Sequence, residues 1–492
     1  MLHYFAVQSV WSKFSRMLNN PSSVSADGDD EESRPDQIGV SRARFFPRDC
    51  GFGITMGTNA FQHPASLRRL SFPWVGVQIF LMLFAAATNL RAQATAVKID
   101  LEQAIQLAIE HNHALKAART LVEQSQAEET TAAIRPNPVF TYDDLYVPLF
   151  SPSYLNSTTL NNVTEFDGGL SWTFERGGKR KARIRAARDQ TAVTRSQVND
   201  TQRTLTFNVA QQFVAVLQAE STLQFAKQDL ESFRKTVNIS EEQLKAGDMS
   251  RADYLKIKLQ LLQFQTDVSS AQLAQVQALA SLRAFLGYDA VPADYDVAGE
   301  LSYTPLHANK EDLQAMALGL RPDLLAAKQG VTAAESQHNL ARANRARPLT
   351  TTLDYTHVSA LNSLSFTTSI EIPIFDRNQG EIARTHYAVT QAQENRAVAE
   401  ETVMTDVTNA YEAFRTADEV VRLYESGYLK NAQDSRDISE FAFRHGAASL
   451  LDFLDAERSY RSTQLAYRQA LGAYMLAVEQ LKETVGTRKL GP

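Results

Sequence analysis

The side chains best placed for chemistry are two carboxylates in the C-terminal part of the chain, Asp452 and Asp455. Their spacing of three residues puts both on one face of a helix. Asp253 occupies the matching position in a second stretch of similar sequence. Carboxylates held close together attract cations, whereas a carboxylate in the first turn of a helix stabilises the helix dipole. The sequence leaves both roles open for Asp253 and Asp452.

Other kinds of chemistry have little support in the sequence. His111 and His113 are two positions apart, which does not put two imidazoles on one helix face, and no carboxylate cluster completes a metal shell. We interpret both as surface residues at a helix end, and we expect no metal and no cofactor. Cys50 is the only cysteine, and neither a nucleophile–base set nor a phosphate-binding loop is evident. The sequence therefore predicts that the protein is not an enzyme.

The carboxylates follow a short motif that occurs twice, at an offset of 199 residues. Gly247 matches Gly446, and Ser250 matches Ser449. Glycine can adopt a positive φ and end one helix, and the Ser-x-x-Asp that follows can begin another. Each copy of the motif therefore predicts the tip of a helical hairpin.

Long segments with helical periodicity lead into and out of these tips. No proline occurs from Arg176 to Gly247 or from Arg377 to Gly446. Each segment has about 70 residues, which is ~105 Å of helix at about 1.5 Å per residue. Shorter helical regions are predicted from Leu101 to Val122 and from Leu313 to Arg347. A helix of the long kind cannot fold into one compact globule.

Two stretches, 165–175 and 363–374, alternate apolar and polar residues as β-strands do. Weaker strands are predicted at 139–146 and 349–360. This alternation suits a strand with lipid on one face and water on the other, and it also occurs in edge strands of soluble sheets. The residues expected to face lipid are Phe166, Leu170, Trp172, Phe174, Leu364, Phe366, Ile370 and Ile372.

The amino terminus has the pattern of an export signal. A basic start, an apolar run and a small-residue cleavage site follow one another between Arg68 and Ala94. We place cleavage after Ala94, with Ala92 as the alternative. The signal peptide is predicted to span 56–94, and residues 1–55 are expected to be a non-native extension from a start codon assigned too far upstream.

Bulk properties exclude some partners and require others. The chain has 492 residues and a net charge of -6, so no basic footprint for nucleic acid is present. No segment has the roughly 20 continuous apolar residues of a transmembrane helix.

Four membrane-type strands cannot close a barrel, because the smallest known barrels need about 8, and open strand edges are not tolerated in lipid. Several copies of the chain are therefore expected to complete one barrel.

The sequence also indicates that the two halves of the chain arose by duplication. Phe375-Asp376-Arg377 matches Phe174-Glu175-Arg176, and Leu324 matches Leu115. The first structural repeat is predicted at 95–300 and the second at 301–492. Each repeat contains a helix, two strands, a very long helix, a tip and a return helix.

The tip motifs and this order of elements resemble the TolC family of outer-membrane efflux proteins, over roughly 99–486. Residues 174–180 and 373–380 look most like the heavy-metal efflux branch of the CzcC type. The resemblance implies a mainly α fold with a transmembrane β-barrel portion. Three chains would form a homotrimer, with 12 strands in one outer-membrane barrel and the long hairpins in a periplasmic α-barrel.

The same resemblance implies a function. The protein would be a passive duct that exports substrates, heavy-metal cations among them, from an inner-membrane pump of the RND type and a periplasmic adaptor. Asp452, Asp455 and Asp253 would line the periplasmic entrance. The adaptor would dock at the tips, which carry Gly247, Gly446, Ser250 and Ser449. The alternatives are a channel for drug efflux or type I protein secretion and, in a different class, a secreted periplasmic coiled-coil scaffold.

Overall fold

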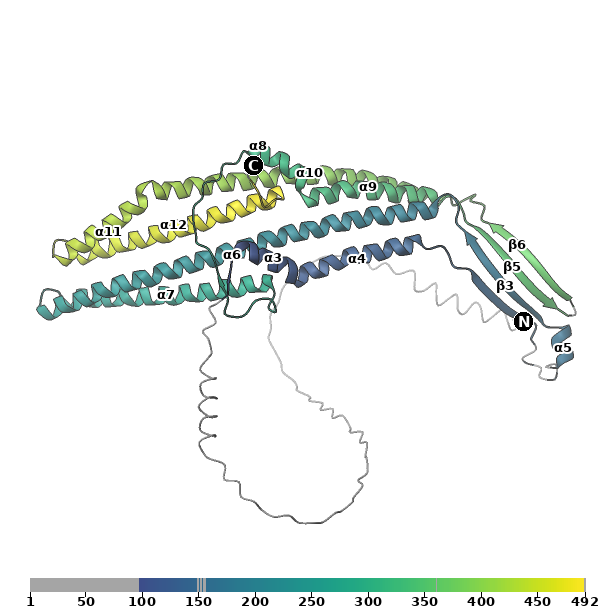
Figure 1. Cartoon of the computed structure of the whole chain (residues 1–492), viewed down its shortest axis with the longest axis horizontal. Helices are drawn as coiled ribbons and strands as arrows, with labels where there is room; N and C mark the ends of the chain where they lie inside the picture. The colour runs from purple at the N-terminus through teal and green to yellow at the C-terminus, as the bar shows by residue number, and fades with distance from the viewer. Residues whose placement is uncertain (1–96, 148–149, 151–152, 154–155, 360, 491–492) are drawn as a thin grey trace, which may run out of the picture. The chain divides into compact units, whose positions relative to one another are not determined.

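The computed structural model describes residues 97–147, 150, 153, 156–359 and 361–490. The expected extension 1–55 and signal peptide 56–94 lie outside these residues. The described part is mainly helical, as expected (Figure 1). Among the described residues, no helix combines the length and the apolar character needed to cross a membrane.

Two long helical hairpins dominate the fold. The first pairs α6 (Lys179–Ala246) with α7 (Arg251–Leu286), and α6 alone has 68 residues, or about 100 Å of helix. The second runs down through α10 (Gln379–Leu423) and α11 (Leu429–Arg444) and returns as α12 (Leu450–Val485). Figure 1 shows the tips of both hairpins at the same end of the helical part.

The descending arm of the second hairpin is not one continuous helix, and this departs from the sequence-based expectation. A π-helical turn, η2 (Tyr424–Tyr428), separates α10 from α11. Gly427 has φ 131° inside this turn. Only glycine reaches that conformation readily, and π turns insert an extra residue into a helix. The interruption therefore depends on Gly427, and the absence of proline from this segment does not reveal it.

Shorter helices flank the hairpins in pairs. The expected regions each divide in two, into α3 (Leu101–His111) with α4 (His113–Ala133), and α8 (Lys310–Leu320) with α9 (Pro322–Ala343). The first break lies at Asn112, whose side chain accepts a hydrogen bond from the Leu115 N–H at 3.1 Å. The second break is followed by Pro322, the first residue of α9. Proline costs no helical hydrogen bond there, because the first N–H groups of a helix have no acceptor within the helix.

Four apolar clusters of the described residues hold the helices together, and the smallest joins α6 to α7 through Leu223, Ala226 and Ala271. One surrounds α3 and the middle of α6, and includes the short parallel pair β1 (Lys98–Ile99) and β4 (Asp296–Val297). A second joins α8, α10 and α12. The third lies near the tips and joins α6, α7 and α12. The two hairpins are thus packed against each other as well as within themselves.

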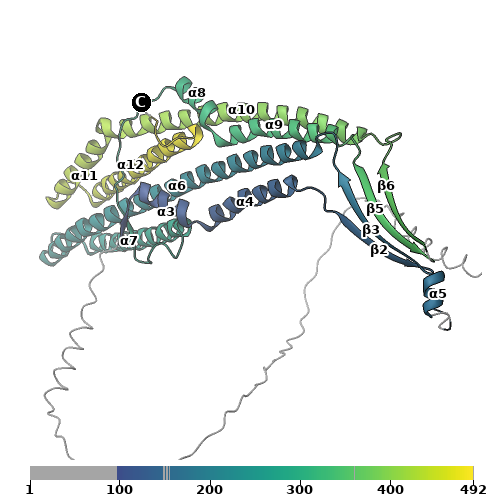
Figure 2. The ribbon, with the colours of Figure 1, turned by 45° about the vertical axis from the view of Figure 1, so that its right-hand side comes forward.

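The other end of the described chain is a four-stranded antiparallel sheet (Figure 2). Its strands occur in the order β2 (Val139–Leu145), β3 (Glu165–Phe174), β5 (Leu349–Val358) and β6 (Leu361–Ile370). A short helix, α5 (Ser157–Asn162), lies between β2 and β3 in the chain.

Register places the predicted apolar positions on a common face. Leu170 is opposite Phe140 on one side and Leu353 on the other, and Leu353 is opposite Phe366. The intervening positions form a second, polar face, as in the row of Ser171, Thr352 and Thr367. Directly opposed residues of an antiparallel pair point to the same side, so the alternation seen in single strands continues across the sheet.

The expectation for Ile372 was wrong. Strand β6 ends at Ile370, which pairs with Leu349, the first residue of β5. Pro348 and Pro373 lie just beyond this last pair. Proline has no N–H to donate to a ladder, so pairing stops before Ile372, which is not a strand residue.

Candidate functional site

The two hairpin tips lie together and form the candidate site. Gln243 Nε2 donates a hydrogen bond to the Arg444 carbonyl oxygen at 3.3 Å, and Thr236 Oγ1 donates to Glu440 Oε1 at 3.0 Å. Stacked rings of Phe443 and Phe453, with centroids 5.3 Å apart, belong to the apolar cluster beneath the tips. The position of each tip therefore depends on the other hairpin.

Both tips have the predicted backbone. Gly247 has φ 87° and Gly446 has φ 71°, and each closes its helix by donating its N–H to a carbonyl in the last turn. Ser250 Oγ accepts the Asp253 N–H at 3.1 Å, and Ser449 Oγ accepts the Asp452 N–H at 3.2 Å. Glycine and the Ser-x-x-Asp pattern thus produce the same turn twice.

The three candidate carboxylates have different surroundings. Asp452 closes a capping box with Ser449, whose hydroxyl donates to Asp452 Oδ2 at 2.7 Å. Hydrogen bonds from Ser250 and then Lys256 hold the pKa of Asp253 below its usual range. Asp455 is 71% exposed, with the Arg458 guanidinium 3.6 Å away. Asp253 and Asp452 therefore stabilise the start of a helix, whereas Asp455 does not take part in a helix cap.

An open groove with a volume of about 790 Å³ lies between the tips. Gly446, Ser250, Ser449 and Asp253 are among the residues that line it. Asp452 and Asp455 are not. The structure thus separates a groove shared by the two tips from the pair of carboxylates at the start of α12.

A buried group of charges above the tips was not predicted from the sequence. Asp229 of α6 and Glu457 of α12 are 4% and 6% exposed. Arg461 Nε lies 2.7 Å from Asp229 Oδ2, and a second Arg461 nitrogen pairs with Asp267 of α7. Burial and the neighbouring Asp229 raise the pKa of Glu457 to about 8. A carboxyl group that keeps its proton near neutrality therefore joins the two hairpins.

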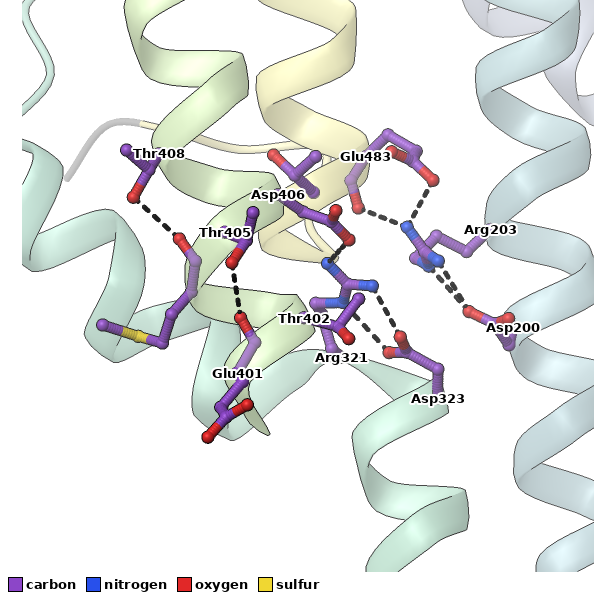
Figure 3. Close-up of polar contacts among 12 residues, drawn as sticks. Asp200, Arg203, Arg321, Asp323, Glu401, Thr402, Thr405, Asp406, Thr408 and Glu483 are labelled. Carbon is purple, nitrogen blue, oxygen red and sulfur yellow. Dashed lines mark hydrogen bonds and ion pairs between the residues drawn. The ribbon is translucent and has the colours of Figure 1, made fainter. Parts of the chain in front are cut away.

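A second ionic group holds the shorter helices against the hairpins (Figure 3). Arg321, only 4% exposed, lies at the break between α8 and α9 and donates to Asp323 at 3.0 Å and to Asp406 at 2.8 Å. Arg203 of α6 pairs with Asp200 at 2.8 Å and also with Glu483 of α12. Arg321 with Asp406, and Arg203 with Glu483, are pairs between different elements, so sequence spacing does not predict them.

His111 and His113 are at helix ends, as predicted, on either side of Asn112. Within the described residues, no group of three or more histidine, cysteine, aspartate or glutamate side chains could hold a metal ion.

Comparison with known proteins gives one family. The family model described as "Outer membrane efflux protein" matches residues 104–288 and 313–487. The cobalt-zinc-cadmium resistance protein CzcC of Cupriavidus metallidurans is 22% identical over 390 residues, covering 79% of this chain and 90% of that protein. The cation efflux system protein CusC of Escherichia coli O157:H7 is 25% identical over 374 residues, covering 73% of this chain and 79% of that protein.

A solved structure has the same fold. A crystal structure of CusC, described as showing conformational changes that accompany folding and transmembrane channel formation, superposes with a TM-score of 0.66 at 21% sequence identity. The match covers 80% of this chain and 93% of that one. The two segments of the family match include the two hairpins and together cover more than half of the chain. This chain therefore belongs to the outer membrane efflux protein family and is an outer-membrane efflux channel.

Proposed function

We propose that three copies of this chain form a passive duct, with one 12-stranded barrel in the outer membrane and an α-barrel of long hairpins in the periplasm. The observation that carries the proposal is the sheet. It has one apolar face, and within the described residues both outer strands, β2 and β6, have an unpaired edge. Unpaired edges are not tolerated in lipid, so further copies must supply the missing partners.

Side chains of the apolar face support its contact with lipid. Trp172, Phe174, Leu364, Phe366 and Ile370 are between 38% and 71% exposed in the single chain. Phe166 and Leu170 lie on the same face and are half-buried. Large apolar side chains exposed in such number mark an interface or a membrane surface.

Helix α7 supports assembly of the helical part. Leu255, Leu259 and Leu262 are 49%, 70% and 59% exposed, and their spacing of four and three continues to Leu273 and Val276. This is the heptad spacing of a helix that packs against another helix. No other element of the described chain covers this seam, and we assign it to a neighbouring copy.

We further propose that the two halves, 95–300 and 301–492, are structural repeats. The order of elements supports this. In each half, two short helices separated by one residue lead to strands, then to a long helix that begins at a left-handed residue, Gly178 or Asn378. A tip and a return helix follow in both.

The tips are proposed as the periplasmic end of the duct. Asp452 and Asp455, repeated in three copies, would give the entrance six carboxylates, with Asp253 nearby on the first hairpin. The groove around Gly446, Ser250 and Ser449, together with Gly247, is the proposed docking site of a periplasmic adaptor. A passive duct cannot couple transport to a source of energy, so the chain would receive its substrate from an inner-membrane pump. We propose a pump of the RND type.

Heavy-metal cations are the proposed cargo. The similarity to CzcC, a cobalt-zinc-cadmium resistance protein, and to CusC, a cation efflux system protein, supports that class. Drug efflux and type I protein secretion are the alternatives within the same architecture. A secreted periplasmic scaffold is disfavoured by the apolar face of the sheet, which such a protein does not need.

Fractionation and a transport assay test the proposal. We expect a heat-resistant trimer in the outer membrane, and metal resistance that is restored only when pump and adaptor are also present. Recovery of a monomer from the soluble periplasm would disprove the duct. Restored resistance to a drug but not to metals would replace the cargo and leave the duct intact.

A further inference from the structure

Two histidines that are 48 positions apart in sequence meet on neighbouring helices. His338 lies on α9 and His386 lies near the start of α10, and these helices pack along each other. The ring centroids are 6.0 Å apart, with 54° between the ring planes. His338 is half-buried and His386 is exposed in the single chain. We propose that His338 and His386 form a binding site for a borderline divalent transition-metal cation, such as Cu²⁺ or Zn²⁺.

Hydrogen bonding determines which nitrogen of His338 is available. Thr385 Oγ1 lies 2.7 Å from the Glu381 carbonyl oxygen and 3.1 Å from the Ile382 carbonyl oxygen, so its only proton is directed at the backbone. The same oxygen is 3.0 Å from His338 Nδ1 and must accept a hydrogen bond there. His338 Nδ1 therefore carries the proton, and Nε2 has the free lone pair that binds a cation.

This arrangement is the one that metal-binding histidines usually adopt. Their second ring nitrogen donates to an oxygen, which holds the ring and makes it a better ligand. Thr385 is 2% exposed, and its own bonds to the turn before it keep the acceptor in place. The second ligand, His386, follows Thr385 directly in the chain and can rotate because it is exposed.

Distances between the rings suit a shared ion. With metal–nitrogen bonds of about 2.0–2.1 Å, two imidazoles on one ion have centroids roughly 5 to 6.5 Å apart, according to the angle between the bonds. The observed 6.0 Å lies in this range. Imidazole nitrogen favours copper, zinc and nickel over the hard cations, and Cu²⁺ is expected to bind more tightly than Zn²⁺.

Two protein ligands make a weak site. The remaining coordination positions are left to water, since no third histidine, cysteine, aspartate or glutamate of the described residues completes a cluster here. A site of this kind releases its ion readily. It therefore suits a cation that passes along the protein and not a resident cofactor, and its existence does not depend on which cargo the duct carries.

The test is metal binding by the purified, detergent-solubilised mature protein without a polyhistidine tag. Calorimetry with Cu²⁺ and with Zn²⁺ measures affinity, and electron paramagnetic resonance of the Cu²⁺ form reports nitrogen ligands. We expect one Cu²⁺ per chain with nitrogen coordination. His338→Gln and His386→Gln should each weaken binding at least ~10-fold.

Two further variants make the result specific. His113→Gln removes an exposed histidine at the start of α4 and should leave binding unchanged. Thr385→Val keeps both imidazoles but removes the hydrogen-bond acceptor, and it should weaken binding by a smaller factor. Thermal melting without metal checks that all four variants are folded. Equal Cu²⁺ affinity in the wild type, His338→Gln and His386→Gln, or no binding by the wild type at ~1 mM Cu²⁺, overturns the proposal.

Discussion

Asp452 and Asp455 stand three residues apart but have separate surroundings. Asp452 accepts from both the Ser449 N–H and the Ser449 hydroxyl, so neutralising it removes part of a helix start. Asp455 is 71% exposed and lies 3.6 Å from the Arg458 guanidinium. A structural role and a role at the entrance can therefore be measured one residue at a time.

For the entrance, we expect Asp455→Asn to lower cation selectivity with little change in stability. Asp452→Asn should lower selectivity and also stability, by about 1 kcal/mol, because the capping box is weakened. The double variant should also reduce block by trivalent ions, since grouped carboxylates can share one ion. Reversal potentials in a salt gradient across planar bilayers measure selectivity. Potentials identical to the wild type in all three variants would leave only the helix-start role.

Glu457 predicts a pH dependence of stability. Its pKa is raised from 4.5 to about 8 by burial and then by Asp229, so between these values the folded protein holds a proton that the unfolded chain has lost. Stability therefore falls as the pH rises through this window and becomes level above about 8. Asp229, Asp267, Tyr460, Arg436 and Arg461 are the titratable and charged groups around it.

Glu457→Gln cannot lose a proton, so its stability should depend less on pH, and its thermal midpoint should exceed that of the wild type at pH 8. Glu419→Gln is the matched control, because Glu419 is 69% exposed and lies 3.8 Å from Arg415. Thermal unfolding measured from pH 5 to 9 checks the slope. The same slope in the wild type and in Glu457→Gln would show that the buried carboxyl does not hold the extra proton.

At the scale of elements, two glycines of the second hairpin, Gly427 and Gly446, act differently. Gly446 ends α11 at the tip with φ 71°, whereas Gly427 lies inside a π turn with φ 131°. Neither has an atom within 4 Å of the position that a Cβ would take. Each position therefore favours glycine because of its positive φ, and not because a larger side chain would lack space.

Gly446→Val should strain the tip by about 1 kcal/mol or more, because β-branched residues avoid positive φ. We expect a lower yield of trimer or weaker binding of the adaptor. Gly330→Val is the control, since Gly330 also has open space around it but lies within α9 without a positive φ. Trimer yield on gels and adaptor pull-down measure the difference. Equal behaviour of the two variants would contradict the argument from φ.

At the scale of the whole molecule, the described chain leaves surface uncovered that other copies would cover in the proposed duct. The edges of β2 and β6 are unpaired, and the leucine seam of α7 is exposed. In the proposed trimer, neighbouring copies would cover both.

Disulfide cross-linking tests this trimer. The only cysteine, Cys50, lies outside the described residues and before the expected cleavage site, so the mature protein offers a cysteine-free background. Thr141→Cys on β2 combined with a cysteine at Ser363, Ser365 or Thr367 on β6 should give covalent trimers on oxidation. Single-cysteine proteins should give none. If no pairing along β6 yields a product between chains, the shared barrel is wrong.

Local sequence was sufficient to predict several features of this protein. The tips follow from Gly247 and Gly446 with their Ser-x-x-Asp partners, because a helix end is made by residues within one turn. The alternation at 165–175 predicted a strand and its apolar face, because successive side chains of a strand point to opposite sides. The absence of proline predicted the continuous helix α6, but it did not predict the interruption at Gly427.

Tertiary structure alone decided the features that depend on distant contacts. Gly330 lies inside a helix and Gly427 interrupts one, and no neighbouring residue distinguishes them. The order of strands, with β3 beside β5, joins segments that are about 180 residues apart in the chain. His338 with His386, and Asp229 with Glu457, likewise become pairs only where helices pack. Charge and metal chemistry arise here from side chains on different elements, which sequence spacing within one element cannot reveal.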